Sequence, residues 1–246
     1  MAGGFVQGLS GFAFGLTAMA IWAWSIEPVL AGPLVAFGTL FGQLLSIGTV
    51  RRGMEAGLIW PLVAGGILGV PLGVALLPHI DQLAFKLGVG VLLLVWRPAM
   101  LVARDISRIT GGGRLADALV GWIGGIMCGI AGLNGPAPTL WTTLRGWGRD
   151  RQRAVFQTFS LVTQALTIAA YLATGIIQTG TAWLFAVIVP AMLIPTLVGA
   201  RLYRSFTDAG FRRIVLGLLA LSGAILVATS VPAFFWKITE KYRWVG

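Results

Sequence analysis

The chain has 246 residues, of which 57% are hydrophobic and only 11% are charged. So few charged side chains cannot cover the surface of a water-soluble protein of this size. The net charge is +10, but the basic residues stand at the ends of apolar segments, where membrane orientation and anionic lipid headgroups account for them. The composition therefore predicts a protein whose surroundings are the lipid bilayer, and it excludes nucleic-acid binding.

Windows without Asp, Glu, Lys or Arg indicate where the chain enters the membrane. They are residues 1–26, 28–50, 118–144, 154–200 and 214–236. A spanning helix needs about 20 apolar residues, so the longest window holds two segments. With two further apolar stretches, the sequence predicts segments at about 3–24, 29–50, 57–77, 83–103, 118–144, 154–173, 182–200 and 214–231. We expect a single transmembrane domain over residues 1–246, with an interfacial tail at 232–246.

The two halves of the chain resemble each other in order. Gly8-Leu9-Ser10-Gly11 stands in the first segment, and Gly132-Leu133-Asn134-Gly135 stands in the fifth. Further matches follow in the same order in both halves: Gln43 with Gln164, Trp60 with Trp183, and Phe85-Lys86 with Phe211-Arg212. This shared order predicts a duplication, with repeat 1 at 3–103 and repeat 2 at 118–231.

The arginines indicate how the two repeats are oriented. The connections on both sides of the fifth segment are basic, with Arg97, Arg104, Arg108 and Arg114 before it and Arg145, Arg149, Arg151 and Arg153 after it. Basic connections belong on the cytoplasmic side, so both belong there. The fifth segment must then turn back, which we expect at Asn134-Gly135-Pro136, and the first segment should do the same from the outside.

Each half then has one re-entrant hairpin followed by three spanning helices. Because three crossings end on the side of the membrane opposite to where they began, the second half is inserted in the opposite orientation. The prediction is an all-α polytopic membrane protein made of two inverted repeats, each with one broken, re-entrant helical hairpin plus three transmembrane helices. Eight plain crossings with parallel repeats remain the alternative.

Polar residues within these apolar segments are the candidate substrate-binding residues. A hairpin tip at membrane depth gathers backbone amides, and helix N-termini there attract anions. The candidates are Ser10, Gly11, Asn134 and Gly135 at the tips, the paired Gln43 and Gln164, and Gln157 and Thr17 near them. Interhelical hydrogen bonds are the alternative role for the glutamines, and close helix packing is the expected role of Gly65, Gly69 and Gly73.

The residues that the segments lack also restrict the function. No acidic residue stands in the middle of a segment, which disfavours a cation as substrate and favours an anion. The sequence shows no metal-ligand cluster, Walker motif or nucleophile–base pairing, so we expect neither a cofactor, nor a metal, nor an enzyme.

These motifs resemble the sulfite exporter TauE/SafE family. The resemblance rests on the chain length, the duplicated glycine-rich hairpin, and the basic pair Arg51-Arg52 after the second segment. It also rests on Gly69-Val70-Pro71-Leu72-Gly73, followed by Phe85-Lys86. Where the family has runs of glycine, this chain has Gly11-Phe12-Ala13-Phe14-Gly15 and Gly135-Pro136-Ala137-Pro138.

The resemblance implies a multi-pass secondary transporter of small anions in the inner (plasma) membrane. The expected substrates are organosulfonates or sulfur oxyanions such as sulfite, thiosulfate and sulfoacetate, held between the two hairpin tips and moved by alternating access. An anion channel of similar architecture and a membrane assembly subunit without transport are the alternatives. Small residues on helix faces leave a homodimer open.

Overall fold

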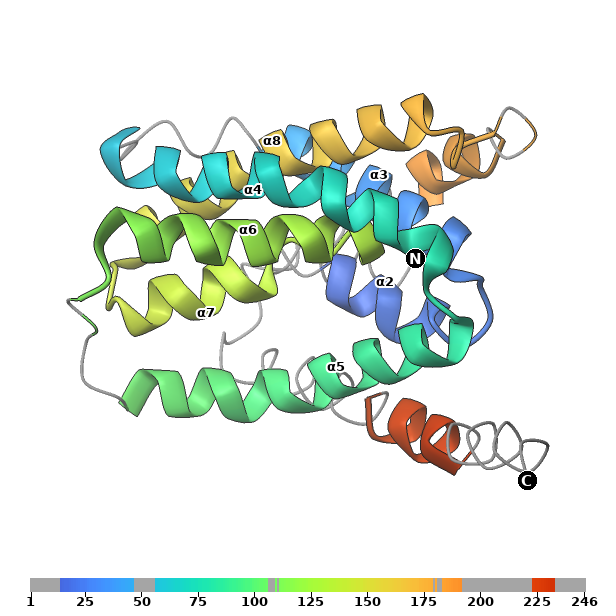
Figure 1. Ribbon diagram of the computed structural model, residues 1–246, viewed down its shortest axis with the longest axis horizontal. Helices are drawn as coiled ribbons and strands as arrows, with labels where there is room; N and C mark the ends of the chain where they lie inside the picture. Colours follow the sequence, from blue (N-terminus) through green and yellow to red (C-terminus); the bar gives the residue numbers. More distant parts are fainter. Residues whose placement is uncertain are drawn as a thin grey trace, which may run out of the picture.

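The computed structural model describes residues 14–46, 56–105, 109, 111–178, 180, 183–191 and 223–232, and their regular structure is entirely helical (Figure 1). The labelled helices are α2 (Phe14–Trp22), α3 (Pro28–Ser46), α4 (Ala56–Leu76), the short 3-10 helix η2 (Leu77–His79), α5 (Gln82–Asp105), α6 (Gly113–Ala131), α7 (Pro136–Leu144) and α8 (Arg149–Ala173). Residues 183–191 and 223–232 are also helical. The all-α prediction is therefore confirmed for this part of the chain.

Four of these helices are long and apolar enough to cross a membrane: Gly57–His79, Gln82–Met100, Gly113–Ala131 and Arg151–Ala173. They match the third to sixth predicted segments. Large apolar side chains stand on their outer faces, and Leu68 is 71% exposed. Such a surface is unfavourable in water and suits contact with lipid. The protein is thus a multi-pass helical membrane protein.

The fifth predicted segment is broken near its middle. Helix α6 ends at Ala131, and Gly132 follows with a φ of 66°, a left-handed conformation that favours glycine. Helix α7 begins at Pro136, a position that suits proline because the first helical N–H has no partner within the helix. Residues 132–135, here called the hairpin tip, are therefore unwound where the sequence predicts the turn.

Beyond the hairpin tip, α7 runs back alongside the first half of α6 (Figure 1). At its end, Arg145 Nη2 lies 3.0 Å from Asp117 Oδ1, and Trp141 donates its indole N–H to the same oxygen at 2.7 Å. At its start, a Cβ added to Gly124 would lie 3.2 Å from Pro138 Cδ. Helices α6 and α7 are thus an antiparallel hairpin, and α7 begins level with the middle of α6.

Helices α4 and α6 pack backbone against backbone through glycines. A Cβ added to Gly65 would overlap the carbonyl oxygen of Ala118, and one added to Gly121 would overlap that of Leu62. The full set, here called the glycine seam, is Gly65, Gly69 and Gly73 of α4 with Gly121, Gly125 and Gly129 of α6. The packing role predicted for Gly65, Gly69 and Gly73 is confirmed. Because these faces are occupied within the chain, they carry no argument for a homodimer.

Helices α3 and α8 run antiparallel, and both contact the hairpin tip. Near one end of the pair, Gln157 Nε2 lies 3.4 Å from the carbonyl oxygen of Gln43. Near the other end, a Cβ added to Gly32 would lie 3.1 Å from the hydroxyl of Tyr171. Between these points Gly132 packs against the backbone of α3. The hairpin tip is therefore wedged between the two helices.

Candidate functional site

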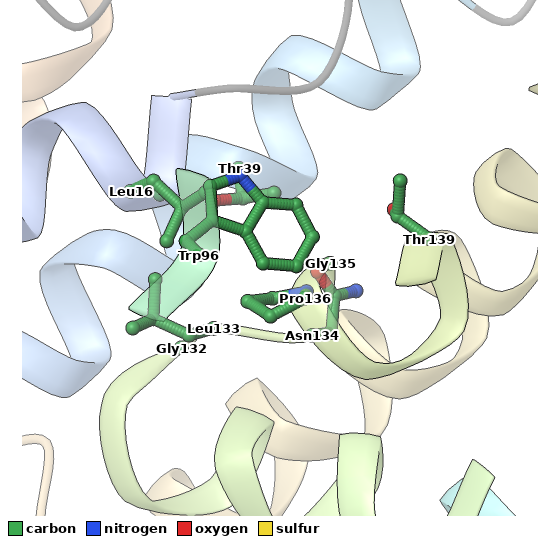
Figure 2. Close-up of a pocket in the computed structure, with 10 residues that line it drawn as sticks. Leu16, Thr39, Trp96, Gly132, Leu133, Asn134, Gly135, Pro136 and Thr139 are labelled. Atoms are coloured by element: carbon green, nitrogen blue, oxygen red, sulfur yellow. The ribbon is translucent and has the colours of Figure 1, made fainter. Parts of the chain in front are cut away.

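The hairpin tip borders a small, partly open hollow, whose free space in this structure is about that of one water molecule. Four helices and the tip contribute to its lining (Figure 2). This tip hollow is lined by Gly15, Leu16, Thr39, Trp96, Gly132, Leu133, Asn134, Gly135, Pro136 and Thr139. Because α7 begins level with the middle of α6, the tip hollow lies beside a helix that is long and apolar enough to cross a membrane.

Polar side chains reach the tip hollow from three elements. Asn134 comes from the hairpin tip, Thr39 from α3 and Thr139 from α7. Asn134 is 2% exposed, and its Nδ2 donates to Thr163 Oγ1 of α8 at 3.1 Å, which fixes the direction of the amide. Thr39 Oγ1 is buried and has no hydrogen-bond partner among the described residues. A buried hydroxyl without a partner is costly, so Thr39 is available to a ligand.

The remaining side chains of the lining are apolar. Trp96 of α5 is 7% exposed, and its indole lies across the hollow from the hairpin tip, next to Pro136 (Figure 2). Leu16 and Leu133 complete the apolar part, and with Trp96 they belong to one buried cluster. The tip hollow thus offers hydrogen bonds and an apolar wall to the same ligand.

No charged side chain is among the residues that line the tip hollow. A positive contribution comes from the backbone instead, because the N-terminus of α7 begins in the lining and helix N-termini carry partial positive charge. Pro136 and Pro138 have no N–H group, so this helix start has fewer donors than usual. Side chains must therefore supply a larger share of the hydrogen bonds.

The predicted site residues occupy three places. Asn134 and Gly135 line the tip hollow itself. Gln164 is fully buried behind it, with Nε2 donating to the carbonyl oxygen of Gly132 at 2.8 Å. Gln43 and Gln157 meet each other between α3 and α8. Among the described residues, no hydrogen bond joins Gln43 to Gln164.

The other three predicted site residues stand near the start of the chain. Thr17 is buried on α2, next to Leu16, but it is not among the described residues that line the tip hollow. Ser10 and Gly11 lie outside the described residues, as does the first expected hairpin tip.

Sequence reasoning missed Thr39 and Trp96. Thr39 precedes Gln43 by one helical turn on an apolar helix, and that spacing of two polar residues on one face is a signal that could have found it. Trp96 stands beside Arg97 near a segment end, where tryptophan is typical of the membrane interface. Its place in the lining depends on how α5 packs, and no local pattern shows that.

A family model described as "Sulfite exporter TauE/SafE" matches residues 1–226 of the 246. The chain belongs to the sulfite exporter TauE/SafE family. Neither the curated proteins nor the solved structures provide a significant match. TauE/SafE proteins are membrane transporters of sulfur-containing anions rather than enzymes, which agrees with the apolar, multi-pass architecture of this chain. The tip hollow is accordingly considered below as a place where such an anion binds.

Proposed function

We propose that this TauE/SafE protein is a secondary transporter of a small sulfur-containing anion, which binds in the tip hollow. The proposed substrates are organosulfonates or sulfur oxyanions such as sulfoacetate, thiosulfate and sulfite. The observation that carries the proposal is the interrupted helix: an unwound hairpin tip, a helix N-terminus and the unpaired hydroxyl of Thr39 meet beside one hollow at membrane depth. Discontinuous helices of this kind hold anionic groups in other transporters.

Uncharged groups suit an anion that must be released again on the other side. Asn134 and Thr39 can donate to sulfonate or sulfite oxygens, and the start of α7 adds its partial positive charge. A fixed arginine in the lining would hold the anion more tightly. The nearest basic residue on α7, Arg145, stands at the opposite end of that helix and pairs with Asp117.

The proposed architecture is an inverted repeat. Helix α2, described from Phe14, follows the first glycine motif as α7 follows the second. Both contribute to the tip hollow, α2 through Gly15 and Leu16 and α7 through Pro136 and Thr139. Trp60 and Trp183, which correspond in the sequence, are each 63% exposed. These correspondences support two copies that rock against each other, in the inner membrane with the arginine-rich end in the cytoplasm.

Transport in proteoliposomes tests the proposal. We expect saturable uptake of labelled sulfite or sulfoacetate, accelerated by substrate on the opposite side. Asn134→Ala should reduce uptake about tenfold, because a hydrogen bond to a charged group contributes about 1.5–3 kcal/mol. Thr174→Ala is the matched control, since the exposed Thr174 hydroxyl bonds only within its own helix in the described structure. Equal uptake by Asn134→Ala and the control would contradict the site, and uptake without saturation would favour a channel.

A further inference from the structure

Buried polar residues continue from the tip hollow along α3 and α8. On α3, Gln43 follows the lining residue Thr39 by one turn. On α8, Ser160 and Gln157 precede Thr163, the partner of Asn134, by three and six residues. The two lines meet where Gln157 Nε2 lies 3.4 Å from the carbonyl oxygen of Gln43. We call Thr39, Gln43, Gln157 and Ser160 the polar seam.

Three polar atoms in this seam have no partner among the described residues: Thr39 Oγ1, Gln43 Nε2 and Ser160 Oγ. Their side chains are buried, with Ser160 fully so. An unpaired polar group in an apolar interior destabilises the folded protein. Three of them on these two helices indicate groups that gain partners in another state of the protein, when the seam contains a ligand or water.

Beyond the hairpin tip, the polar side chains on α8 have hydrogen-bond partners. There, Thr167 Oγ1 and Cys128 Sγ lie 3.2 Å apart and share a hydrogen bond. Tyr171 donates its hydroxyl to the carbonyl oxygen of Gly129 at 2.6 Å. Level with the tip, Gln164 donates through Nε2 and leaves only its Oε1 without a described partner. The unpaired groups therefore extend from the tip in one direction.

That direction leads to the basic end of the molecule. The polar seam runs toward the end of α3 and the start of α8, where the sequence reads Arg149-Asp150-Arg151-Gln152-Arg153. The base of the α6–α7 hairpin lies at this end too, because Gln152 Nε2 lies 3.4 Å from the carbonyl oxygen of Thr142 in α7. Basic residues at the end of a polar path raise the local concentration of anions.

We propose that the polar seam is the path by which the anion passes between the tip hollow and the arginine-rich end. In this structure the path is closed by contact of α3 with α8. It opens when those helices separate, and Gln43 and Ser160 then donate hydrogen bonds to the passing anion or to water around it. This inference rests on the proposed function, since it assigns a route to the same substrate.

Cysteine accessibility tests the route in the full chain. In a Cys128→Ser background, which keeps a hydroxyl near Thr167, Ser160→Cys is compared with Thr167→Cys on the same face of α8. The probe is the anionic reagent sulfonatoethyl methanethiosulfonate, applied to vesicles of both orientations. We expect Ser160→Cys to react at least about tenfold faster than Thr167→Cys when the arginine-rich end faces the reagent. Equal rates at the two positions would overturn the inference.

Two further measurements separate this inference from the proposed function. Thr39→Cys in the same background reports on the tip hollow, and sulfoacetate should slow its modification. Sulfite is unsuitable as the protecting anion because it cleaves thiosulfonates. If Thr39→Cys reacts but Ser160→Cys does not, the anion takes another route and the inference fails. If sulfoacetate does not slow the modification of Thr39→Cys, and calorimetry shows no binding of sulfoacetate, sulfite or thiosulfate, the proposed function fails instead.

Apolar substitutions in the polar seam provide a second test, in which turnover and binding of the anion are measured separately. Gln43→Leu and Ser160→Ala should lower turnover of sulfoacetate about tenfold, while its binding to the tip hollow changes less than about twofold. Binding is measured by calorimetry on the purified protein, and turnover in proteoliposomes. Unchanged turnover in both variants would overturn the route, and a loss of binding would show that these residues belong to the binding site rather than to a path.

Discussion

The glycine seam joins α4 to α6, the polar seam lies along α3 and α8, and the two are built in opposite ways. In the glycine seam, backbone meets backbone, and the described glycines leave no room for a side chain. In the polar seam, long side chains lie between α3 and α8, and several of their polar atoms have no described partner. Close packing resists displacement, whereas unpaired groups favour a state in which they find partners. The comparison indicates that the contact of α4 with α6 is fixed, whereas the contact of α3 with α8 can open.

The largest loss of stability should follow from removing the ion pair at the base of the α6–α7 hairpin. Asp117 pairs with Arg145 and accepts the indole N–H of Trp141, and both charged side chains are nearly buried. Asp117→Ala leaves Arg145 without its partner, so we expect a loss of about 3–5 kcal/mol in stability. Thermal unfolding of the purified protein, followed by size-exclusion chromatography, measures it. Asp117→Asn should lose less, and an unchanged melting temperature in both variants would contradict the anchoring role.

A smaller loss should follow when the glycine seam is spread apart. A Cβ at Gly65 would overlap the backbone of Ala118, so Gly65→Ala should destabilise the protein by about 1–3 kcal/mol. Gly57→Ala is the matched control on the same helix, because a Cβ there has nothing within 4 Å. The control should be neutral or stabilising by up to about 1 kcal/mol. Equal melting temperatures for the two variants would show that α4 and α6 are not fixed by their glycines.

Apolar substitutions in the polar seam should leave the stability of the protein unchanged or raise it, in contrast to the two losses above. Thr39→Val and Gln43→Leu replace unpaired buried groups by apolar ones of similar size, so each should leave stability unchanged or raise it by about 1 kcal/mol. The same thermal assay checks this, with Thr163→Val as the control. Thr163 accepts the hydrogen bond from Asn134, and its loss should lower the melting temperature. Destabilisation by Thr39→Val and Gln43→Leu as large as that by Thr163→Val would remove the contrast between the two seams.

The smallest effect should be a change in substrate preference at Trp96. Its indole forms part of the apolar wall of the tip hollow, where it can contact the methylene of sulfoacetate but finds no such group in sulfite. One methylene is worth about 0.8 kcal/mol, so Trp96→Phe should lower the ratio of sulfoacetate to sulfite transport by about twofold to fourfold. Competition between the two anions in proteoliposomes measures the ratio. A proportional loss for both anions would show that Trp96 only supports the fold.

Some of this architecture could be predicted from the sequence because its causes are local. The basic connections on both sides of residues 118–144 required a return of the chain, and glycine and proline at 132–136 showed where a helix would be interrupted. Gly65, Gly69 and Gly73 showed close packing through their regular spacing. Asn134 and Gly135 were identified as candidates because they belong to that interruption. The two-repeat organisation remains a prediction where it depends on residues outside the described ranges.

The rest depends on contacts between distant segments. Asp117 and Arg145 are 28 residues apart, and only the return of α7 brings them together. Trp96 reaches the tip hollow because α5 packs against the cluster that contains Leu133. Gln43 meets Gln157 rather than Gln164, because the antiparallel register of α3 and α8 decides the pairing. Sequence symmetry indicated which residues are equivalent, but it did not indicate which are neighbours.

The level at which α7 begins has an electrical consequence. Its start lies beside Gly124, near the middle of α6, so a monovalent anion held there would sit about halfway through the transmembrane voltage drop. Moving one elementary charge across 100 mV is worth about 2.3 kcal/mol, so half of that distance corresponds to about a sevenfold change in apparent affinity. Currents recorded from the loaded transporter should therefore depend on voltage even though no charged side chain lines the hollow among the residues described.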